Sequence, residues 1–310
     1  MTNTKLSIII VNWNAGELLL NCINSIIKSD INSDKIEIIV VDNDSSDNSL
    51  NNLPDQVILI RNKQNIGFGE ACNIGFKYSK TKYKLLLNPD TEVLDNTLSQ
   101  SITFMDNNPD VSILGAQHIN EKGDVAPSCA KFPKPRNFVN YALGLSKLFP
   151  NIFHSATLMV YWDHKNSAYV DHVMGAYMFI RSSTIDKIGD MDPQFFVYFE
   201  DLDLSKRVSN NNLKSYYYTD ISIYHKGRGT SDQVKDLRLF YSLRSRLFYA
   251  KKHYNLINSS FLFFFTLFIE PFSRLFFETL HLRFYNYINI INGYLKLYNY
   301  FLNPFSKRTK

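Results

Sequence analysis

The chain has 310 residues, of which 45% are hydrophobic and 15% aromatic, and its formal net charge is +5. This composition excludes an intrinsically disordered chain, and the length allows one large domain or two smaller ones. The three cysteines, Cys22, Cys72 and Cys129, lie far apart in the sequence. Their spacing excludes a disulfide framework or a thiolate zinc site and favours a reducing compartment.

The charge is distributed unevenly along the chain. From Thr230 onward there are 12 Lys/Arg and 4 Asp/Glu, whereas the preceding residues carry 22 and 25. This change predicts one domain at 1–230 and a helical, aromatic and basic region at 231–310. Basic residues mixed with Phe, Leu and Tyr favour an anionic membrane surface over nucleic acid. The alternatives are an ordinary solvated helix face, a lid on the core or a homo-oligomer interface.

Short apolar runs alternate with helical patterns through the first part of the chain. Strands are expected at 6–11, 36–41, 57–61, 85–87 and 111–116, and helices at 17–28 and 98–105. Strand–helix–strand alternation predicts an α/β fold with a mostly parallel central sheet. The first strand–helix turn lacks Gly-x-Gly-x-x-Gly, and the sequence contains no Gly-x-x-x-x-Gly-Lys-Ser/Thr. A glycine cradle for phosphates is therefore not expected.

Polar side chains follow two of these strands. Asp42 comes directly after the strand at 36–41, where its carboxylate can accept hydrogen bonds from a ribose or a base. Asp90 follows the strand at 85–87, which Asn88-Pro89 ends because proline cannot donate to a ladder. Ligands bind beyond the carboxyl ends of such strands, and a carboxylate there suits a divalent cation that holds a diphosphate. The alternative is an ordinary strand-to-loop turn.

A second acidic stretch lies further along the chain. The residues at 117–170 are irregular and suit an acceptor-binding lid, and a strand at 176–180 is entered through Gly175. Five aromatic or apolar residues then precede Glu200 and Asp201, which open a helix. These neighbours would desolvate a carboxylate and raise its pKa toward that of a general base. The alternative is charge that stabilises a helix N-terminus.

The final strand of this part is expected at 214–223. His225 follows it and is bracketed by Lys226 and Arg228. A histidine in this place can bind a metal ion or contact a diphosphate, and a structural role is the alternative.

Six of these stretches, in this order, resemble the inverting glycosyltransferases of family 2. They are Val11–Asn14, Val40–Ser49, Asn65–Gly69, Leu87–Asp90, Gly175-Ala176 and Phe199–Asp201. The resemblance is to the rhamnosyltransferase-like enzymes of bacterial O-antigen, capsule and cell-wall synthesis, and it covers about residues 5–230. It implies a GT-A fold, a nucleotide-sugar donor and a divalent cation, Mg²⁺ or Mn²⁺.

The resemblance also implies roles for single residues. Asp42 would bind the nucleoside, and Asp90 would be the metal-binding acid of an Asp-x-Asp element in which Asn88 replaces the first acid. His225 would contact the metal or the diphosphate. Further donor contacts would come from Val11, Asn12, Asn14, Asn65, Gly67, Asn73 and Asn88.

The same resemblance implies which residues act in catalysis and which lie near the acceptor. Asp201 would be the general base, with Glu200 as the adjacent alternative. Gly175 and Ala176 would lie beside the acceptor.

The implied reaction moves a sugar, with rhamnose from dTDP-rhamnose favoured, to a hydroxyl of a lipid-linked glycan. A UDP-hexose-dependent enzyme and a catalytically silent nucleotide-sugar-binding scaffold are alternatives. A sugar nucleotidyltransferase would need a basic, glycine-rich loop after the first strand, and residues 12–16 have no basic residue.

The N-terminal residues and the apolar tail bear on location. Residues 1–5 lack the pattern of a signal peptide, so we expect no export and a cytoplasmic enzyme at the inner face of the membrane. The apolar segment at 261–269 is expected to end at Glu270-Pro271, short of the roughly 20 residues that a spanning helix needs. An interfacial or re-entrant segment is therefore expected.

Overall fold

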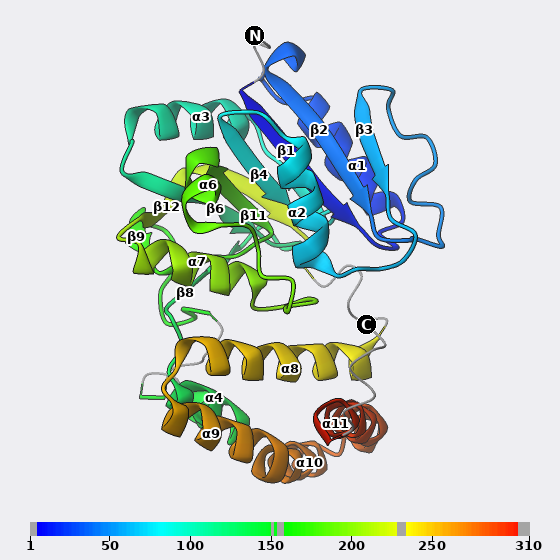
Figure 1. Ribbon diagram of the computed structural model, residues 1–310, viewed down its shortest axis with the longest axis vertical. Helices are drawn as coiled ribbons and strands as arrows, with labels where there is room; N and C mark the ends of the chain where they lie inside the picture. Colours follow the sequence, from blue (N-terminus) through cyan, green and yellow to red (C-terminus); the bar gives the residue numbers. More distant parts are fainter. Residues whose placement is uncertain (1–4, 150–151, 154–157, 228–233, 303–310) are drawn as a thin grey trace. The chain divides into compact units, whose positions relative to one another are not determined.

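The computed structural model describes residues 5–149, 152–153, 158–227 and 234–302. The chain forms two compact units, labelled by element in Figure 1. The first consists of Met1–Phe132, Trp162–Pro193 and Glu200–Thr230, and the second of Pro133–Tyr161, Gln194–Phe199 and Ser231–Lys310. The second unit thus includes two segments that the sequence analysis placed in the first domain.

The first unit is built on a ten-stranded sheet formed by the described residues, with β3-β2-β1-β4-β11-β6-β12-β5 as the main strand order. Its long strands are β1 (Leu6–Asn12), β2 (Ile36–Asp42), β3 (Val57–Arg61), β4 (Tyr83–Leu87), β6 (Val111–Ile119), β11 (Tyr177–Arg181) and β12 (Lys214–His225). The shorter strands are β5 (Thr91–Val93), β7 (Val125–Ala126) and β9 (Ala168–Val170). β8 (Cys129–Ala130) and β10 (His172–Val173) form a separate pair.

The directions of the strands determine where the polar strand ends lie. β1, β2, β3 and β4 run parallel, and β12 runs parallel to β6. β11 is antiparallel to both β4 and β6. The carboxyl ends of β1, β2, β4, β6 and β12 therefore share one edge of the sheet with the beginning of β11. The predicted α/β fold with a mostly parallel sheet is confirmed.

Helices pack against this sheet because their apolar faces match buried strand residues. They are α1 (Glu17–Ile27), α2 (Phe68–Tyr78), α3 (Thr97–Asn107), α6 (Ser182–Ile188) and α7 (Glu200–Asn210). In α1 the apolar positions recur at helical spacing, and Leu19, Cys22 and Ile23 join the core formed with β1 and β4. Cys22, Cys72 and Cys129 are free and buried.

The second unit is helical. It contains α4 (Pro135–Ala142), α5 (Leu145–Leu148), α8 (Lys235–His253), α9 (Leu256–Phe264), α10 (Glu270–Leu280) and α11 (Tyr287–Leu302). Phe240, Leu243 and Leu297 lie in the core that α8 and α11 share. Short 3₁₀ turns occur at Ser33–Lys35 and Phe284–Asn286.

The expectation that Glu270-Pro271 ends the apolar segment is wrong. A π-helical turn at Phe265–Ile269 joins α9 to α10, so the helical backbone continues from Leu256 to Leu280. Pro271 lies directly after this π-helical turn, whose altered hydrogen-bond pattern accommodates the missing N–H of proline within the continuous helix. In the described part of the chain this is the one helix long and apolar enough, by length and composition, to cross a membrane.

At Gly75, α2 packs closely against Ile9 of β1. A Cβ at this position would lie 2.5 Å from Cγ2 of Ile9. We expect Gly75→Ala to lower the free energy of unfolding by about 1–3 kcal/mol, because the added methyl overfills the core. Chemical denaturation of Gly75→Ala, Ile9→Ala and the double variant measures this. Ile9→Ala removes the clashing atoms, so adding Gly75→Ala to it should cost little, and an equal cost in both backgrounds would contradict the packing account.

Candidate functional site

The carboxyl ends of β1 and β2 hold the first predicted pair, with Asn12 opposite Asp42 in the register. Nδ2 of Asn12 donates to Oδ1 of Asp42 at 2.8 Å, and the backbone N–H of Ser45 donates to Oδ2 at 3.2 Å. The Asp42 carboxylate is therefore fixed by the neighbouring strand and by its own turn. Asn12 is wholly buried, and its side chain positions Asp42. Direct donor contacts of Val11, Asn12 and Asp42 stay predictions.

The loops that follow these strands are tied to each other. Oδ1 of Asn14 accepts a hydrogen bond from the backbone N–H of Ser46 at 2.8 Å, and Asn14 itself has a positive φ of 51°. Gly67 has a φ of 90°, and its N–H donates to Oδ1 of Asn65 at 2.9 Å. Backbone conformations of this kind are found at ligand-binding turns, where glycine avoids the strain. These hydrogen bonds lie within the protein, so the donor contacts of Asn14, Asn65 and Gly67 stay predictions.

Asn73 has a structural role in α2. Its Nδ2 donates to the carbonyl of Met191 at 2.8 Å, and the N–H of Met191 donates back to Oδ1 at 2.9 Å. This pair of bonds holds α2 to the segment that precedes the acidic helix. The predicted contact of Asn73 with the donor stays a prediction.

The ends of β4 and β12 bring Asp90 and His225 together. Oδ1 of Asp90 lies 3.5 Å from Nε2 of His225. The pairing of β5 with β12 causes this approach, because it places His225 opposite Thr91, the residue after Asp90. The sequence analysis predicted each residue separately as a metal ligand, and the structure shows that the two side chains lie next to each other.

A second histidine backs this pair. The His118 ring, at the end of β6, lies edge-on to His225 with ring centroids 5.2 Å apart. Burial, with further contributions from His225 and His164, lowers the pKa of His118 to about 3. His118 is therefore neutral at physiological pH and adds no positive charge beside Asp90.

The donor set of Asp90 and His225 fits a divalent cation. In the described part of the chain there is no group of three or more His, Cys, Asp or Glu arranged to hold a metal ion. Asp90 and His225 provide one carboxylate, which suits hard cations such as Mg²⁺ and Mn²⁺, and one imidazole, which is a common ligand of divalent transition metals. Two protein ligands leave most positions around an ion for oxygens of a substrate or water.

Asp201 is held at the same edge of the sheet by Gly175, which lies two residues before β11. The N–H of Gly175 donates to Oδ2 of Asp201 at 3.0 Å. A Cβ at position 175 would lie 3.1 Å from that oxygen, so a larger residue would displace the carboxylate. The carbonyl of Ala176 accepts from the N–H of Asn88 at 3.1 Å. Backbone contacts thus connect the loop of Asp90 to the position of Asp201.

His172 lies beside Asp201 and was not predicted. Its Nε2 is 3.7 Å from Oδ2 of Asp201, and its Nδ1 is 2.9 Å from Oγ of Ser205. Burial lowers the pKa of His172, and the carboxylates of Asp201 and Asp171 oppose part of that shift. The sequence gives one signal for this residue, a histidine three positions before Gly175.

Glu200 differs sharply from its neighbour Asp201. It is buried, and its Oε2 has no hydrogen-bond partner among the described residues. Burial, and then the Asp201 carboxylate, raise the pKa of Glu200 well above its usual range. Burial and the neighbouring Asp201 carboxylate thus both favour the protonated form of Glu200 by raising its pKa. Tyr198 and Phe199, just before it, both have positive φ, and strain of this kind concentrates at functional sites.

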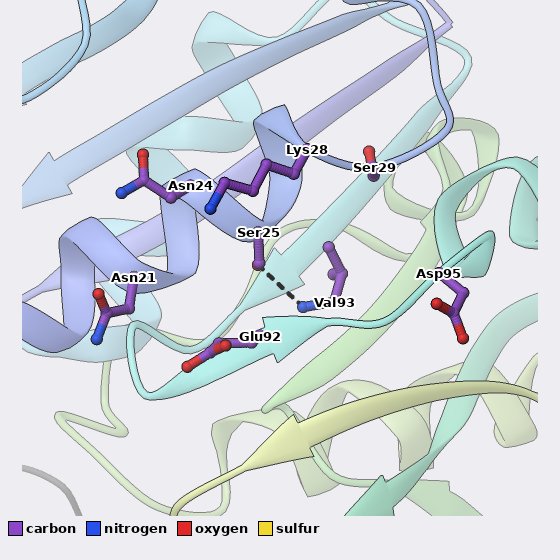
Figure 2. Close-up of a pocket in the computed structure, with 8 residues that line it drawn as sticks. All are labelled: Asn21, Asn24, Ser25, Lys28, Ser29, Glu92, Val93 and Asp95. Atoms are coloured by element: carbon purple, nitrogen blue, oxygen red, sulfur yellow. Dashed lines mark hydrogen bonds between the residues drawn. The ribbon is translucent and has the colours of Figure 1, made fainter.

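A separate hollow of about 520 Å³ lies between α1 and the β5 region (Figure 2). Inside it, Oγ of Ser25 accepts a hydrogen bond from the N–H of Val93 at 3.0 Å. Its lining consists of Asn21, Asn24, Ser25, Lys28, Ser29, Glu92, Val93 and Asp95. None of these is a predicted site residue, so the hollow is distinct from the site at the sheet edge.

Comparison with known families identifies the class of this site. The sequence model described as "Glycosyl transferase family 2" matches residues 7–165, just over half of the chain. The chain belongs to this family. The family resemblance found in the sequence is thereby confirmed, and family membership implies a nucleotide-sugar donor and a glycan acceptor.

Two curated relatives extend this result. The low-salt glycan biosynthesis hexosyltransferase Agl10 of Haloferax volcanii is 28% identical over 213 residues, which cover 67% of this chain and 62% of that protein. The rhamnosyltransferase WbbL of Escherichia coli is 26% identical over 206 residues, which cover 63% of this chain and 74% of that protein. The match therefore spans less than two thirds of the Haloferax relative.

The fold has counterparts among solved structures. The mannosyltransferase PcManGT from Pyrobaculum calidifontis, solved with GDP-Man and Mn²⁺, aligns with a TM-score of 0.55 at 14% identity. The alignment covers 94% of this chain and 86% of PcManGT. This likeness confirms the predicted GT-A fold.

The buried His172 predicts a pH dependence of stability. Its folded pKa is lowered, so its contribution is complete above about pH 6.5 and is lost as the pH falls, because the unfolded chain then binds an extra proton. Chemical denaturation between about pH 7 and pH 5 should show a steeper loss for the wild type than for His172→Gln. The difference is at most about 1.4 kcal/mol per pH unit. Parallel slopes would contradict the lowered pKa.

Proposed function

We propose that this family 2 glycosyltransferase moves one sugar from a nucleotide donor to a hydroxyl of a glycan acceptor, with inversion at the anomeric carbon. The observation that carries the proposal is the placement of two acidic groups at one sheet edge. Asp90 meets His225 there, and Asp201 is held by the N–H of Gly175. A leaving-group site and a base are the two parts that a single displacement needs.

Asp201 is the proposed general base. Its carboxylate accepts the proton of the acceptor hydroxyl while that oxygen attacks the anomeric carbon. The bond from the anomeric carbon to the donor diphosphate breaks in the same step, which inverts the configuration. Gly175 orients the carboxylate, and the absence of a side chain there keeps Oδ2 in place. Gly175 and Ala176 would lie beside the acceptor, and Asp42 would bind the nucleoside.

Asp90 and His225 would hold a divalent cation, Mg²⁺ or Mn²⁺. When bound, the cation supplies positive charge that stabilises the leaving diphosphate. The Asp90 carboxylate suits either ion, and the Mn²⁺ named for PcManGT supports Mn²⁺. Asn88 in place of a second acid lowers the negative charge of the site, so the donor diphosphate would contribute to the affinity for the ion.

The proposed donor is dTDP-rhamnose, and the proposed acceptor is a lipid-linked glycan of bacterial surface-polysaccharide synthesis at the inner face of the membrane. The named activity of the relative WbbL supports rhamnose. A UDP-hexose is the second candidate, supported by the hexosyltransferase Agl10. Assays with both donors and one acceptor preparation discriminate between them.

Two isosteric changes test the assignment of the base. Asp201→Asn should lower kcat by about 10²–10⁴-fold, because the amide cannot accept the acceptor proton. Glu200→Gln is the matched control, since burial raises the pKa of Glu200 and favours its neutral form, whose shape the amide preserves. Turnover and donor binding should both be measured. If Glu200→Gln lost turnover and Asp201→Asn retained it, the roles would be reversed.

A further inference from the structure

One helix face of the second unit leaves large apolar side chains exposed along its length. The exposed positions recur every three or four residues, which is the period of a single helix face. They are Ile257, Phe261, Phe264, Phe268, Phe272 and Phe276, here called the aromatic stripe. Each is about half exposed or more. By residue number they lie on α9, on the π-helical turn and on α10, and Figure 1 shows α9 and α10 as neighbouring helices. A row of this size marks an interaction surface.

The opposite face of the same helix is already occupied. Leu262 and Leu267 are buried in the two cores of the second unit. Glu270 is fully buried and is bound by Arg246 of α8 and by Arg274. If the helix crossed a membrane, this ion-pair network would have to leave its partners on α8 and enter hydrocarbon. The aromatic stripe is therefore suited to a surface that the helix touches from one side.

The charge of the second unit indicates which surface this is. The unit carries 15 Lys/Arg and 4 Asp/Glu, whereas the first unit carries 19 and 25. Its acids in the described residues are engaged: Asp236 with Lys296, Glu270 with two arginines, and Glu278 with Asn286. Two copies of so cationic a unit repel each other, whereas an anionic surface attracts it.

Basic residues also lie at both ends of the aromatic stripe. Lys251 and Lys252 are exposed at the end of α8, directly before α9, and Arg283 is exposed directly after α10. Aromatic side chains on one helix face, with Lys and Arg beside them, are typical of helices that lie in the membrane interface. An interface with a second copy of this chain does not require basic residues at both ends of the aromatic stripe.

We propose that the aromatic stripe docks onto an anionic lipid membrane, with α9 and α10 lying in the plane of the interface and Lys251, Lys252 and Arg283 at the level of the headgroups. The phenyl rings enter the boundary between headgroups and acyl chains. This surface binds lipid without using the donor, the cation or Asp201. The proposal is therefore independent of the proposed sugar transfer.

Co-sedimentation of the full chain with lipid vesicles tests this surface. We expect binding to vesicles that contain phosphatidylglycerol and much weaker binding to pure phosphatidylcholine. The triple variant Phe268→Ser/Phe272→Ser/Phe276→Ser should lose binding, with a melting temperature close to the wild type because these rings are exposed. Lys251→Gln/Lys252→Gln should weaken binding to anionic vesicles by about fivefold per charge.

Matched controls come from the first unit. Ile27→Ser/Tyr78→Ser removes two exposed apolar side chains that lie outside the aromatic stripe, and it should leave vesicle binding unchanged. Sedimentation equilibrium without lipid tests whether a second copy of this chain covers the aromatic stripe instead. A wild-type dimer that the triple phenylalanine variant dissociates, together with no vesicle binding, would overturn the proposal. Failure of the wild type to bind anionic vesicles would overturn it as well, and neither outcome would alter the assay of sugar transfer.

Discussion

The direction of the strands is the constraint on which the rest of this site depends. Because β1, β2, β4, β6 and β12 run the same way, the residues that follow them meet at one edge. β11 runs the opposite way, so its first residues arrive at that edge as well. Asp42, Asp90, His225 and Gly175 come from distant parts of the sequence, and none needs a long loop to reach the site. The sheet determines where the strand ends lie, and the short turns that follow them carry the polar side chains of the site.

Much of this arrangement could be predicted from the sequence. Apolar runs such as 36–41 and 85–87 predict strands that the structure confirms within a residue or two, because burial on both faces leaves a continuous hydrophobic signal. The edge location of Asp42 and Asp90 follows from the same runs. β5 gave no such signal, since Thr91–Val93 has three residues and a charge at its centre.

Other features depend on contacts between distant residues and leave little trace in the sequence. His172 becomes part of the site because β10 brings it next to Asp201, and no local pattern predicts that pairing. The contrast between Glu200 and Asp201 arises from burial of one of two adjacent acids. The predicted end of the helix at Pro271 was wrong. A proline commonly ends a helix, but here a π-helical turn directly precedes it and the helix continues.

The central claim is that the edge of the sheet binds a nucleotide sugar together with a divalent cation held by Asp90 and His225. The most direct measurement is the melting temperature with dTDP- and UDP-sugars, with and without Mn²⁺, for the wild type and Asp90→Ala. Ligands that bind only the folded state raise the melting temperature. The account predicts a rise with one donor that requires the cation and disappears in Asp90→Ala. A cation-independent rise that Asp90→Ala preserves, or no rise with any donor, would contradict it.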